Sequence, residues 1–336
     1  MSDNQTNSTV LVTGVSGYLG QQCAAELLRQ GYDVRGTVRS LAKADLVRSA
    51  LAKVTDRADD LVFVEADLLN DLGWADAMAD VDFVLHVASP FIMGEPDHPD
   101  ELIKPAVEGT TRVLNAAMAA GVQRTVLTSS TVAINSDRTS GTSGPGDWAD
   151  PDNVGTYAKS KILAERAAWD LTRAQTGPDV MELTVINPGG IMGPSLTGET
   201  TGASTAMIAD MIGGKMPMVP DISISMADVR DVAKMHVAAM TNPQAPGRRF
   251  VVASEKPIKM IDAAAALKRA GYEKVSTRRA PTLLLKMMAP FNSDVKGMIS
   301  FLGKSVEIDN SETRAILRWE PTPFETSLTD MAASIS

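Results

Sequence analysis

The stretch that most constrains the fold of this chain is VLVTGVSGYLG, residues 10–20. Its apolar start is typical of a buried parallel strand, and an amphipathic helix begins at Tyr18 and Leu19. Three glycines recur at three-residue spacing through the turn: Gly14, Gly17 and Gly20. A strand, a glycine turn and a helix N-terminus predict a pyrophosphate site with these five residues as cofactor contacts, because phosphate can approach bare N–H groups and the positive helix end. The alternative is a tight turn that serves packing alone.

Strands and helices alternate along the first 254 residues. Apolar runs predict strands over residues 10–12, 33–38, 81–89, 124–131, 181–190 and 248–254, with another that ends near Glu65. Helical patterns cover 41–54, 101–120 and 157–174, and the polar stretch 135–154 predicts a loop. This alternation predicts an α/β fold, a Rossmann-type doubly wound parallel sheet with right-handed crossovers.

The alternation breaks after Gly190. A Gly/Thr-rich stretch, a Met-rich helix over 205–212 and a mostly helical remainder predict a smaller C-terminal region that binds substrate. We therefore expect a dinucleotide-binding domain over residues 1–190 plus about 222–254. The substrate-binding domain is expected over about 191–221 plus 255–336.

Composition limits the class of protein. With 336 residues, 44% of them hydrophobic, the chain can bury a large core. A net charge of −9 argues against nucleic-acid and anionic-membrane partners. Cys23 is the single cysteine, so no internal disulfide forms, and the polar start lacks a signal-peptide pattern, which together predict a cytoplasmic protein. Three scattered histidines, His86, His98 and His236, predict no metal site.

The residues after the second strand indicate which nicotinamide cofactor binds. An Asp or Glu here would accept the ribose 2′-hydroxyl of NAD, but the strand is followed by Arg39 and then Lys43. A guanidinium and an ammonium favour the 2′-phosphate, so NADP(H) is the predicted cofactor. The alternative is a pair of solvated surface cations.

Asp67 and Leu68 follow the third strand, at the carboxyl edge where an open α/β sheet binds its ligand. The Asp67 carboxylate is placed to accept a hydrogen bond from the adenine amino group. The alternative is that it caps a helix over residues 70–78.

The fourth and fifth strands end in small or hydroxyl-bearing residues. Ala88 and Ser89 end the fourth strand and leave room for a cofactor, while His86 just before them is interpreted as a core histidine. The fifth strand ends in a run of hydroxyls that begins with Thr128, a further expected cofactor contact.

Tyr157 and Lys161 lie one helical turn apart on one face of a predicted helix. A phenol is a poor acid near neutral pH, since its ordinary pKa is about 10, but a nearby ammonium lowers that pKa. Tyr157 is then suited to give a proton to a carbonyl oxygen, with Ser130 donating to the same oxygen. The alternative is an exposed helical pair, against which the glycine turn and the hydroxyl-ended strand argue.

These motifs occur in the order and form of a known family. VTGVSGYLG, VRGTVRS, EADL, LHVASP, VLTSS, YAKSK and INPGGIMGP make the chain resemble the extended short-chain dehydrogenases/reductases. Within that family it is similar to dihydroflavonol reductases, cinnamoyl-CoA reductases and microbial aldehyde/ketone reductases. The resemblance implies a catalytic triad of Ser130, Tyr157 and Lys161, in which Tyr157 and Lys161 also contact the cofactor and the lysine binds the nicotinamide ribose.

The same resemblance implies contacts along the cofactor. Arg39 would meet the 2′-phosphate, and Asp67 with Leu68 would contact adenine. Pro188 would begin a segment, including Gly190, that lies along the nicotinamide.

The substrate region departs from the flavonoid enzymes of that family. Ala106 stands where the epimerase branch often carries Asn, which argues mildly against a sugar-nucleotide enzyme. Asn135 falls where plant dihydroflavonol reductases place an Asn on substrate, although it is also an ordinary turn residue. A group of methionines is expected to form an adaptable apolar wall of the substrate pocket: Met192, Met207, Met211, Met216, Met218 and Met226. The alternative is that most of them fill the core. Among them, Met192 and Met226 are predicted to contact the substrate.

The sequence therefore predicts an NADPH-dependent carbonyl reductase that acts on a small carbonyl or alcohol, with broad hydrophobic or aromatic substrates. A hydroxysteroid dehydrogenase/isomerase and an NAD-dependent sugar-nucleotide epimerase are alternatives with the same fold. A non-catalytic NADP-sensing protein is an alternative of another class, but it has no need of the triad. The sequence leaves the oligomeric state open between monomer and dimer.

Overall fold

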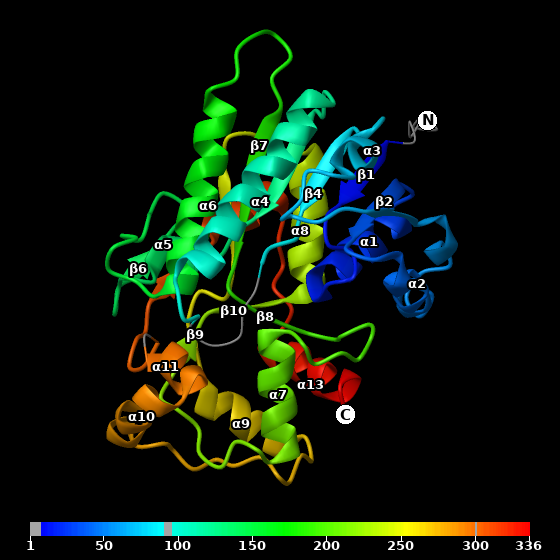
Figure 1. The fold of residues 1–336 in the computed structure, drawn as a ribbon. Helices are drawn as coiled ribbons and strands as arrows, with labels where there is room; N and C mark the ends of the chain where they lie inside the picture. The colour runs from blue at the N-terminus through cyan, green and yellow to red at the C-terminus, as the bar shows by residue number, and fades with distance from the viewer. Residues whose placement is uncertain (1–7, 91–95, 300) are drawn as a thin grey trace.

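The computed structural model describes residues 8–90, 96–299 and 301–336. Its centre is a seven-stranded sheet in the order β11-β7-β5-β4-β1-β2-β3, in which every neighbouring pair is parallel (Figure 1). The chain runs outward from β1 to β3 and then crosses back to β4, so the strand order reverses between β1 and β4. A ligand crevice is expected at that reversal, beyond the carboxyl ends of the strands.

The bounds of the elements are as follows. The large sheet comprises β1 (Thr9–Val12), β2 (Asp33–Val38), β3 (Val62–Glu65), β4 (Phe83–His86), β5 (Arg124–Thr128), β7 (Glu182–Pro188) and β11 (Arg249–Val252). Three two-stranded pairs are β8 (Gly190–Met192) with β10 (Met226–Asp228), β9 (Ser223–Ile224) with β12 (Ile258–Lys259), and β6 (Thr142–Ser143) with β13 (Glu307–Ile308). The helices are α1 (Tyr18–Arg29), α2 (Ala44–Leu51), α3 (Trp74–Met78), α4 (Asp100–Ala119), α5 (Val132–Asn135), α6 (Thr156–Arg173), α7 (Ala203–Gly213), α8 (Val229–Thr241), α9 (Met260–Arg269), α10 (Thr282–Met288), α11 (Ser293–Ile299), α12 (Ser311–Leu317) and α13 (Phe324–Ser334).

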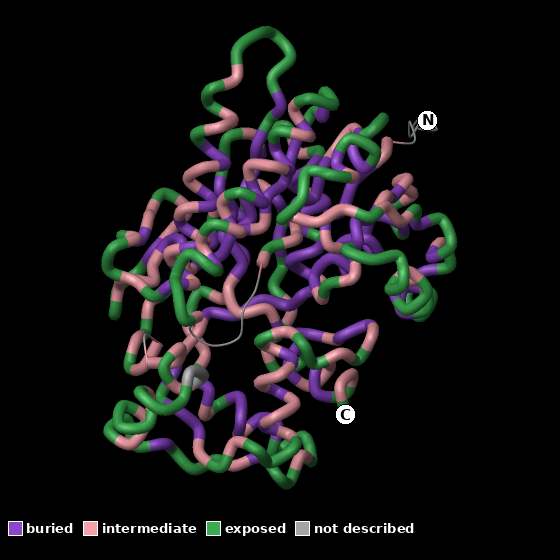
Figure 2. The backbone as a smooth tube through the Cα atoms, viewed as in Figure 1, coloured by how far each residue is buried: buried purple, intermediate pink, exposed green. Residues whose placement is uncertain are grey.

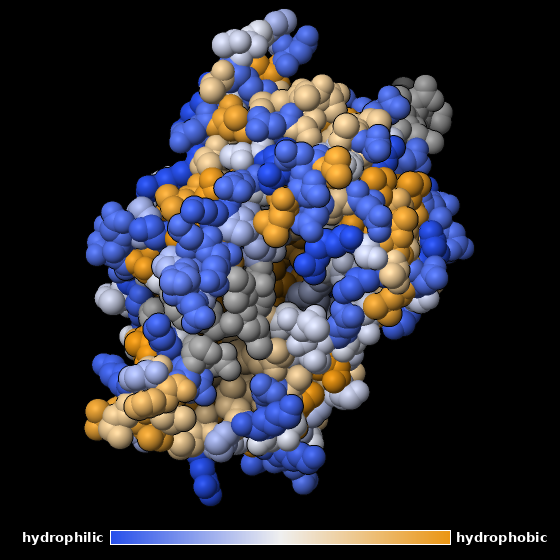
Figure 3. Space-filling view, in the orientation of Figure 1, coloured by the Kyte–Doolittle hydropathy of each residue, from blue (hydrophilic) through white to orange (hydrophobic). Residues whose placement is uncertain are grey.

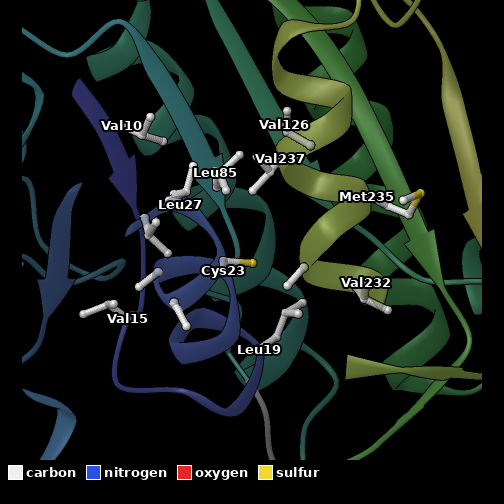
Figure 4. Close-up of a cluster of buried hydrophobic side chains, with 14 of the residues drawn as sticks. Val10, Val15, Leu19, Cys23, Leu27, Leu85, Val126, Val232, Met235 and Val237 are labelled. Atoms are coloured by element: carbon white, nitrogen blue, oxygen red, sulfur yellow. The ribbon is translucent and has the colours of Figure 1, made fainter. Parts of the chain in front are cut away.

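Helices cover both faces of the large sheet, which confirms the predicted doubly wound fold. On one face, α1 packs over β1 and β2, and α8 packs beside it over β4, β5 and β7. Leu27, Leu85 and Val237 gather where the two helices meet (Figure 4). On the other face, α3, α4 and α6 form a second apolar core with side chains of β1, β4, β5 and β7, such as Leu11 and Val84. Strands buried on both faces explain the continuous apolar runs in the sequence.

A smaller region lies at the carboxyl edge of the sheet, below it in Figure 1. Its core joins α7, α9 and α13 to β8 and β10 around methionine, leucine and alanine side chains. Before α13, the chain returns to the large sheet: α12 packs on β11, and Trp319 Nε1 donates to Asp231 Oδ2 on α8 at 3.3 Å. The division into two domains at the proposed boundaries stays a prediction.

Several predicted elements have different limits in the structure. The helix expected over 41–54 starts as a 3-10 turn, and α2 ends at Leu51. Of the segment 70–78 only α3 is helical, because Asn70 Oδ1 accepts from the Leu72 backbone and Gly73 adopts a φ of 85°. The stretch 135–154 is not entirely loop, since Asn135 ends α5 and β6 pairs with β13.

Burial follows this architecture (Figure 2), with most of the sheet and the helix faces against it buried. The exposed large apolar side chains include a group on α10 and the turn after it, at the lower left of Figure 3: Leu283, Met287, Met288 and Phe291. Among the described residues, no helix is long and apolar enough to cross a bilayer.

Candidate active site

The glycine turn stands at the carboxyl end of β1. Gly14 has a φ of 66°, and a Cβ there would lie 3.0 Å from the Cβ of Ala88. Gly17 caps α1 without a side-chain hydrogen bond, and the first turn of α1 holds no acidic residue. These features leave the helix N-terminus open to an anion, whereas Gly20 is required by packing, since its Cβ would collide with the Gly14 carbonyl.

Two threonines that the sequence analysis did not single out hold this turn. Thr37 Oγ1 accepts from Gly14 N at 3.0 Å. Thr13 Oγ1 accepts from Ala88 N at 2.9 Å and lies 2.9 Å from His86 Nδ1. Burial lowers the pKa of His86 to about 3, so this histidine is a neutral core residue, but it is not the satisfied one that was expected, because its Nε2 has no hydrogen-bond partner among the described residues. The signal available in the sequence is that both threonines stand at or beside the ends of strands.

Arg39 and Lys43 lie just beyond the carboxyl end of β2, and both are exposed. In the part of the chain that the structure describes, neither side chain forms an ion pair. Two cations without a carboxylate partner suit a phosphate ligand. Their part in cofactor selection remains a prediction.

Asp67 and Leu68 are half-buried beyond the end of β3. Asp67 Oδ1 accepts from Leu69 N at 3.0 Å, while α3 begins only at Trp74 and is capped by Gly73. Asp67 therefore does not cap a helix over 70–78, and the carboxylate stays at the sheet edge, where the adenine contact is expected.

The structure brings Ser130, Tyr157 and Lys161 together. Ser130 follows β5, and its side chain hydrogen-bonds that of Tyr157 at the start of α6. Lys161 Nζ lies 5.9 Å from the centre of the Tyr157 ring and donates to Ser89 Oγ at 2.9 Å. Ser89 follows β4, so the three side chains meet at the carboxyl edge, close to the strand-order reversal.

Burial shifts the titration of both ionisable groups. The lowered pKa expected for Tyr157 beside an ammonium is not found, since burial raises the pKa of the phenol and the Ser130 hydrogen bond opposes this only in part. Burial lowers the pKa of Lys161 to about 8, and the negative charge of Glu165 opposes this change. Near neutral pH the pair is therefore a neutral phenol beside a cation, the state needed to donate a proton to a carbonyl oxygen.

The remaining expected cofactor contacts lie around this edge. Thr128 Oγ1 is 2.7 Å from His236 Nε2, so its hydroxyl is already engaged with α8. Tyr18 OH donates to Gly193 O at 2.7 Å, which ties the start of α1 to the segment after β8. Pro188 ends β7, and Gly190 begins β8 with its N–H donated to Ser225 O at 2.9 Å. Cofactor contacts at all these positions remain predictions.

The three expected substrate contacts differ in position. Met192 is 1% exposed and Met226 is 7% exposed, and both lie in the apolar core of the smaller region. This burial agrees with the alternative that they fill the core. Asn135 is half-buried at the end of α5. In the described residues, no group of three or more His, Cys, Asp or Glu side chains is arranged to hold a metal ion.

A doubly wound sheet with an uncapped glycine turn and a Ser-Tyr-Lys cluster at its carboxyl edge defines a Rossmann-type dinucleotide-binding protein. The family described as the NAD dependent epimerase/dehydratase family matches residues 10–253. The chain belongs to this family, the extended short-chain dehydrogenases/reductases that its motifs predicted.

Similar proteins include reductases from plants and fungi. Cinnamoyl-CoA reductase 1 of Petunia hybrida is 34% identical over 72% of this chain and 72% of its own. A putative NADPH-dependent methylglyoxal reductase of Candida albicans is 29% identical over 98% of this chain and 99% of its own. The crystal structure of yeast methylglyoxal/isovaleraldehyde reductase Gre2 complexed with NADPH matches with a TM-score of 0.77 at 25% identity, covering 97% of this chain and 98% of that chain.

Proposed function

We propose that this chain is an NADPH-dependent carbonyl reductase that converts hydrophobic or aromatic aldehydes and ketones to alcohols with Ser130, Tyr157 and Lys161. The observation that carries the proposal is the meeting of these three side chains at the carboxyl edge of the sheet, near the glycine turn. The relatives described above are named as reductases, which supports the same reaction class.

The enzyme class and the cofactor agree with the sequence predictions. The chain is an NADP(H)-dependent oxidoreductase: its relatives include a protein named as NADPH-dependent and two reductases crystallised with NADPH. The two exposed cations beyond β2, Arg39 and Lys43, supply the charge that a 2′-phosphate needs.

We assign one group on this edge to each part of the dinucleotide. The uncapped N-terminus of α1 would hold the pyrophosphate through its free N–H groups. Gly14 leaves the turn bare, since a Cβ there would meet Ala88. Arg39 and Lys43 would hold the 2′-phosphate, and Asp67 the adenine amino group. Lys161 would bind the nicotinamide ribose.

Each of the three catalytic side chains has a separate role in the reduction of the carbonyl group. When bound, NADPH supplies a hydride to the carbonyl carbon. Ser130 donates a hydrogen bond to the carbonyl oxygen, and Tyr157 gives that oxygen the proton that completes the alcohol. Lys161 stabilises the phenolate left on Tyr157 until a solvent proton replaces the one transferred. The reverse reaction oxidises the alcohol through the same groups.

Replacing Tyr157 with Phe tests this proposal. Y157F keeps the ring but removes the acid, so kcat should fall at least about 100-fold, as is typical for the loss of a general acid. NADPH affinity should stay within about twofold, because the phenol is only one of many expected cofactor contacts. Turnover is followed by NADPH absorbance with aromatic aldehydes, β-keto esters and methylglyoxal, and binding by NADPH fluorescence.

The matched control is Y272F in the smaller region, where the Tyr272 hydroxyl lies 3.4 Å from Ser336 Oγ and is remote from α6. Its kcat should equal that of the wild type. Unchanged turnover in Y157F would refute the triad. An enzyme that holds NAD and consumes no NADPH with any carbonyl would instead be an epimerase.

A further inference from the structure

A buried ion pair lies directly behind the triad and takes no part in the mechanism above. Glu165 follows Lys161 by one turn on α6, and its side chain is 0% exposed, while that of Arg249 on β11 is 7% exposed. Arg249 Nε donates to Glu165 Oε1 at 2.6 Å. Two charges so far from water are costly to bury, and an apolar pair of similar volume is often at least as stable. Stability alone therefore does not explain why this ion pair is buried here.

The Glu165 carboxylate ties α6 to the ends of two strands. Ser129 Oγ donates to Oε2 at 2.5 Å and Asn187 Nδ2 donates to it at 2.9 Å. Asn187 Nδ2 also donates to the Ser130 carbonyl oxygen at 3.2 Å. Ser129 and Ser130 follow β5, and Asn187 lies on β7. The backbone that carries the Ser130 hydroxyl is thus held by the same carboxylate that lies one turn from Lys161.

Arg249 is fixed on its other side. Its Nη1 donates to Pro145 O at 2.9 Å and to Asp147 O at 2.5 Å, and its guanidinium lies 4.0 Å from the centre of the Trp148 ring. These contacts hold the guanidinium among the loop residues before α6. The cation therefore anchors Glu165 to the loop before α6.

Glu165 lies one helical turn from Lys161 on α6 and borders the same small pocket, so its negative charge is placed near the lysine. Glu165 opposes the effect of burial on the lysine, although no direct hydrogen bond joins them in the described residues. From β4, the facing titratable group is His86, which burial keeps neutral. From α4, the facing residue is Thr110, which cannot titrate. A pocket of about 10 Å³, the space of one water molecule, is bordered by both Lys161 and Glu165.

We propose that Glu165 is a positioning residue of the carbonyl reductase: it fixes the ends of β5 and β7 beneath Ser130 and supplies the negative charge that keeps Lys161 cationic beside Tyr157. This inference rests on the proposed function, because the charge of Lys161 matters only while Tyr157 acts as an acid.

The test compares pH profiles of NADPH-dependent reduction in the full chain. In the wild type, activity should fall as pH rises through about 8, where Lys161 loses its proton. In E165Q the falling limb should move down by about one pH unit. Lys161 would then be about half deprotonated at pH 7, so kcat at pH 7 should drop about twofold and kcat at pH 8 about fivefold. E165D keeps the charge, so its falling limb should return toward that of the wild type even if kcat stays lower.

The matched control is E182Q. Glu182 pairs with the buried Arg124 at the opposite ends of β5 and β7, with Arg124 Nη2 and Glu182 Oε2 2.6 Å apart. E182Q should lower the melting temperature and leave the pH profile unchanged. A variant that only weakened the fold would behave in this way, so the displaced limb in E165Q distinguishes the two roles.

A superimposable pH profile in E165Q, with a wild type that turns over, overturns the inference alone. A wild type that consumes no NADPH with any carbonyl overturns the proposed function as well. Should E165Q not fold, E165Q/R249M removes both charges together, and a smaller shift of the falling limb in the same direction is expected from it, because the Arg249 cation is no longer left unpaired. Failure of both variants to fold would assign Glu165 a structural role only and overturn the inference.

Discussion

The carboxyl edge of the large sheet and the smaller C-terminal region are built from different kinds of contact. At the edge, hydroxyl, amide and charged side chains have defined donors and acceptors, such as Ser129 and Asn187 on Glu165. In the smaller region, the core is a cluster of apolar side chains that includes Met192, Met211 and Met226. On α10, apolar side chains face solvent instead of a partner in the described chain, and Phe291 just after it is 90% exposed (Figure 3).

From this difference we expect the carboxyl edge of the sheet to be rigid and the smaller region to be adaptable. A hydrogen bond fixes distance and direction, so a site made of such bonds holds one geometry. Apolar contacts are not directional, and unbranched methionine side chains repack around ligands of different shape. We therefore expect substitutions at the sheet edge to change cofactor binding and chemistry, and those in the smaller region to change which carbonyl is accepted.

The largest effect is expected from Gly14→Val. A β-branched side chain at a φ of 66° is strained, and its Cβ would press on Ala88. NADPH affinity, measured by fluorescence titration, should fall at least about 100-fold as the turn is displaced. Gly213→Val is the control, since a Cβ at Gly213 meets nothing within 4 Å. A folded G14V variant with wild-type affinity would show that the turn serves packing alone.

A smaller effect is expected from Arg39→Asp. A carboxylate at this position repels a 2′-phosphate and accepts a 2′-hydroxyl, so the ratio of kcat/KM for NADPH over NADH should fall about 100-fold. Steady-state kinetics with both cofactors measure the ratio. Arg173→Asp reverses a charge at the far end of α6 and should leave the ratio unchanged. An equal loss of kcat/KM with NADPH and with NADH would show that Arg39 has only a structural role.

The smallest effect is expected from Met226→Leu. A swap of similar volume costs less than about 1.5 kcal/mol of stability, and NADPH affinity should not change. If Met226 contributes to the substrate wall, KM for bulky aromatic aldehydes should change about threefold relative to methylglyoxal. Met235→Leu, in the core between α8 and the sheet, is the control (Figure 4). Identical KM values in both variants would make Met226 a core filler.

The parts of the site that depend on short spacing were predictable. The glycine turn spans seven residues, and Tyr157 with Lys161 spans one helical turn, so local geometry alone aligns them. The parallel sheet followed from apolar runs alternating with helical patterns. The place of Ser130 needed one further rule, that parallel strands end at a common edge.

The parts that depend on distant pairing were not predictable. Arg249 stands 84 residues after Glu165, and no spacing rule relates a buried arginine on the last strand of the large sheet to a glutamate on α6. The short limits of α2 and α3 were also missed, because turns made by side chains such as Asn70 compete locally with the helix. Burial of Met192 depends on how α7, α9 and α13 assemble, which helical periodicity does not specify.

The return of the polypeptide to the sheet at Trp319, before the final helix, has a consequence for engineering. Neither half of the molecule is one continuous piece of chain, because α12 belongs with the large sheet while its neighbours on both sides lie elsewhere. A chimera designed to take its substrate selectivity from another reductase must therefore exchange several separate segments at once. It must also retain the Trp319 indole, which holds the returning chain to α8.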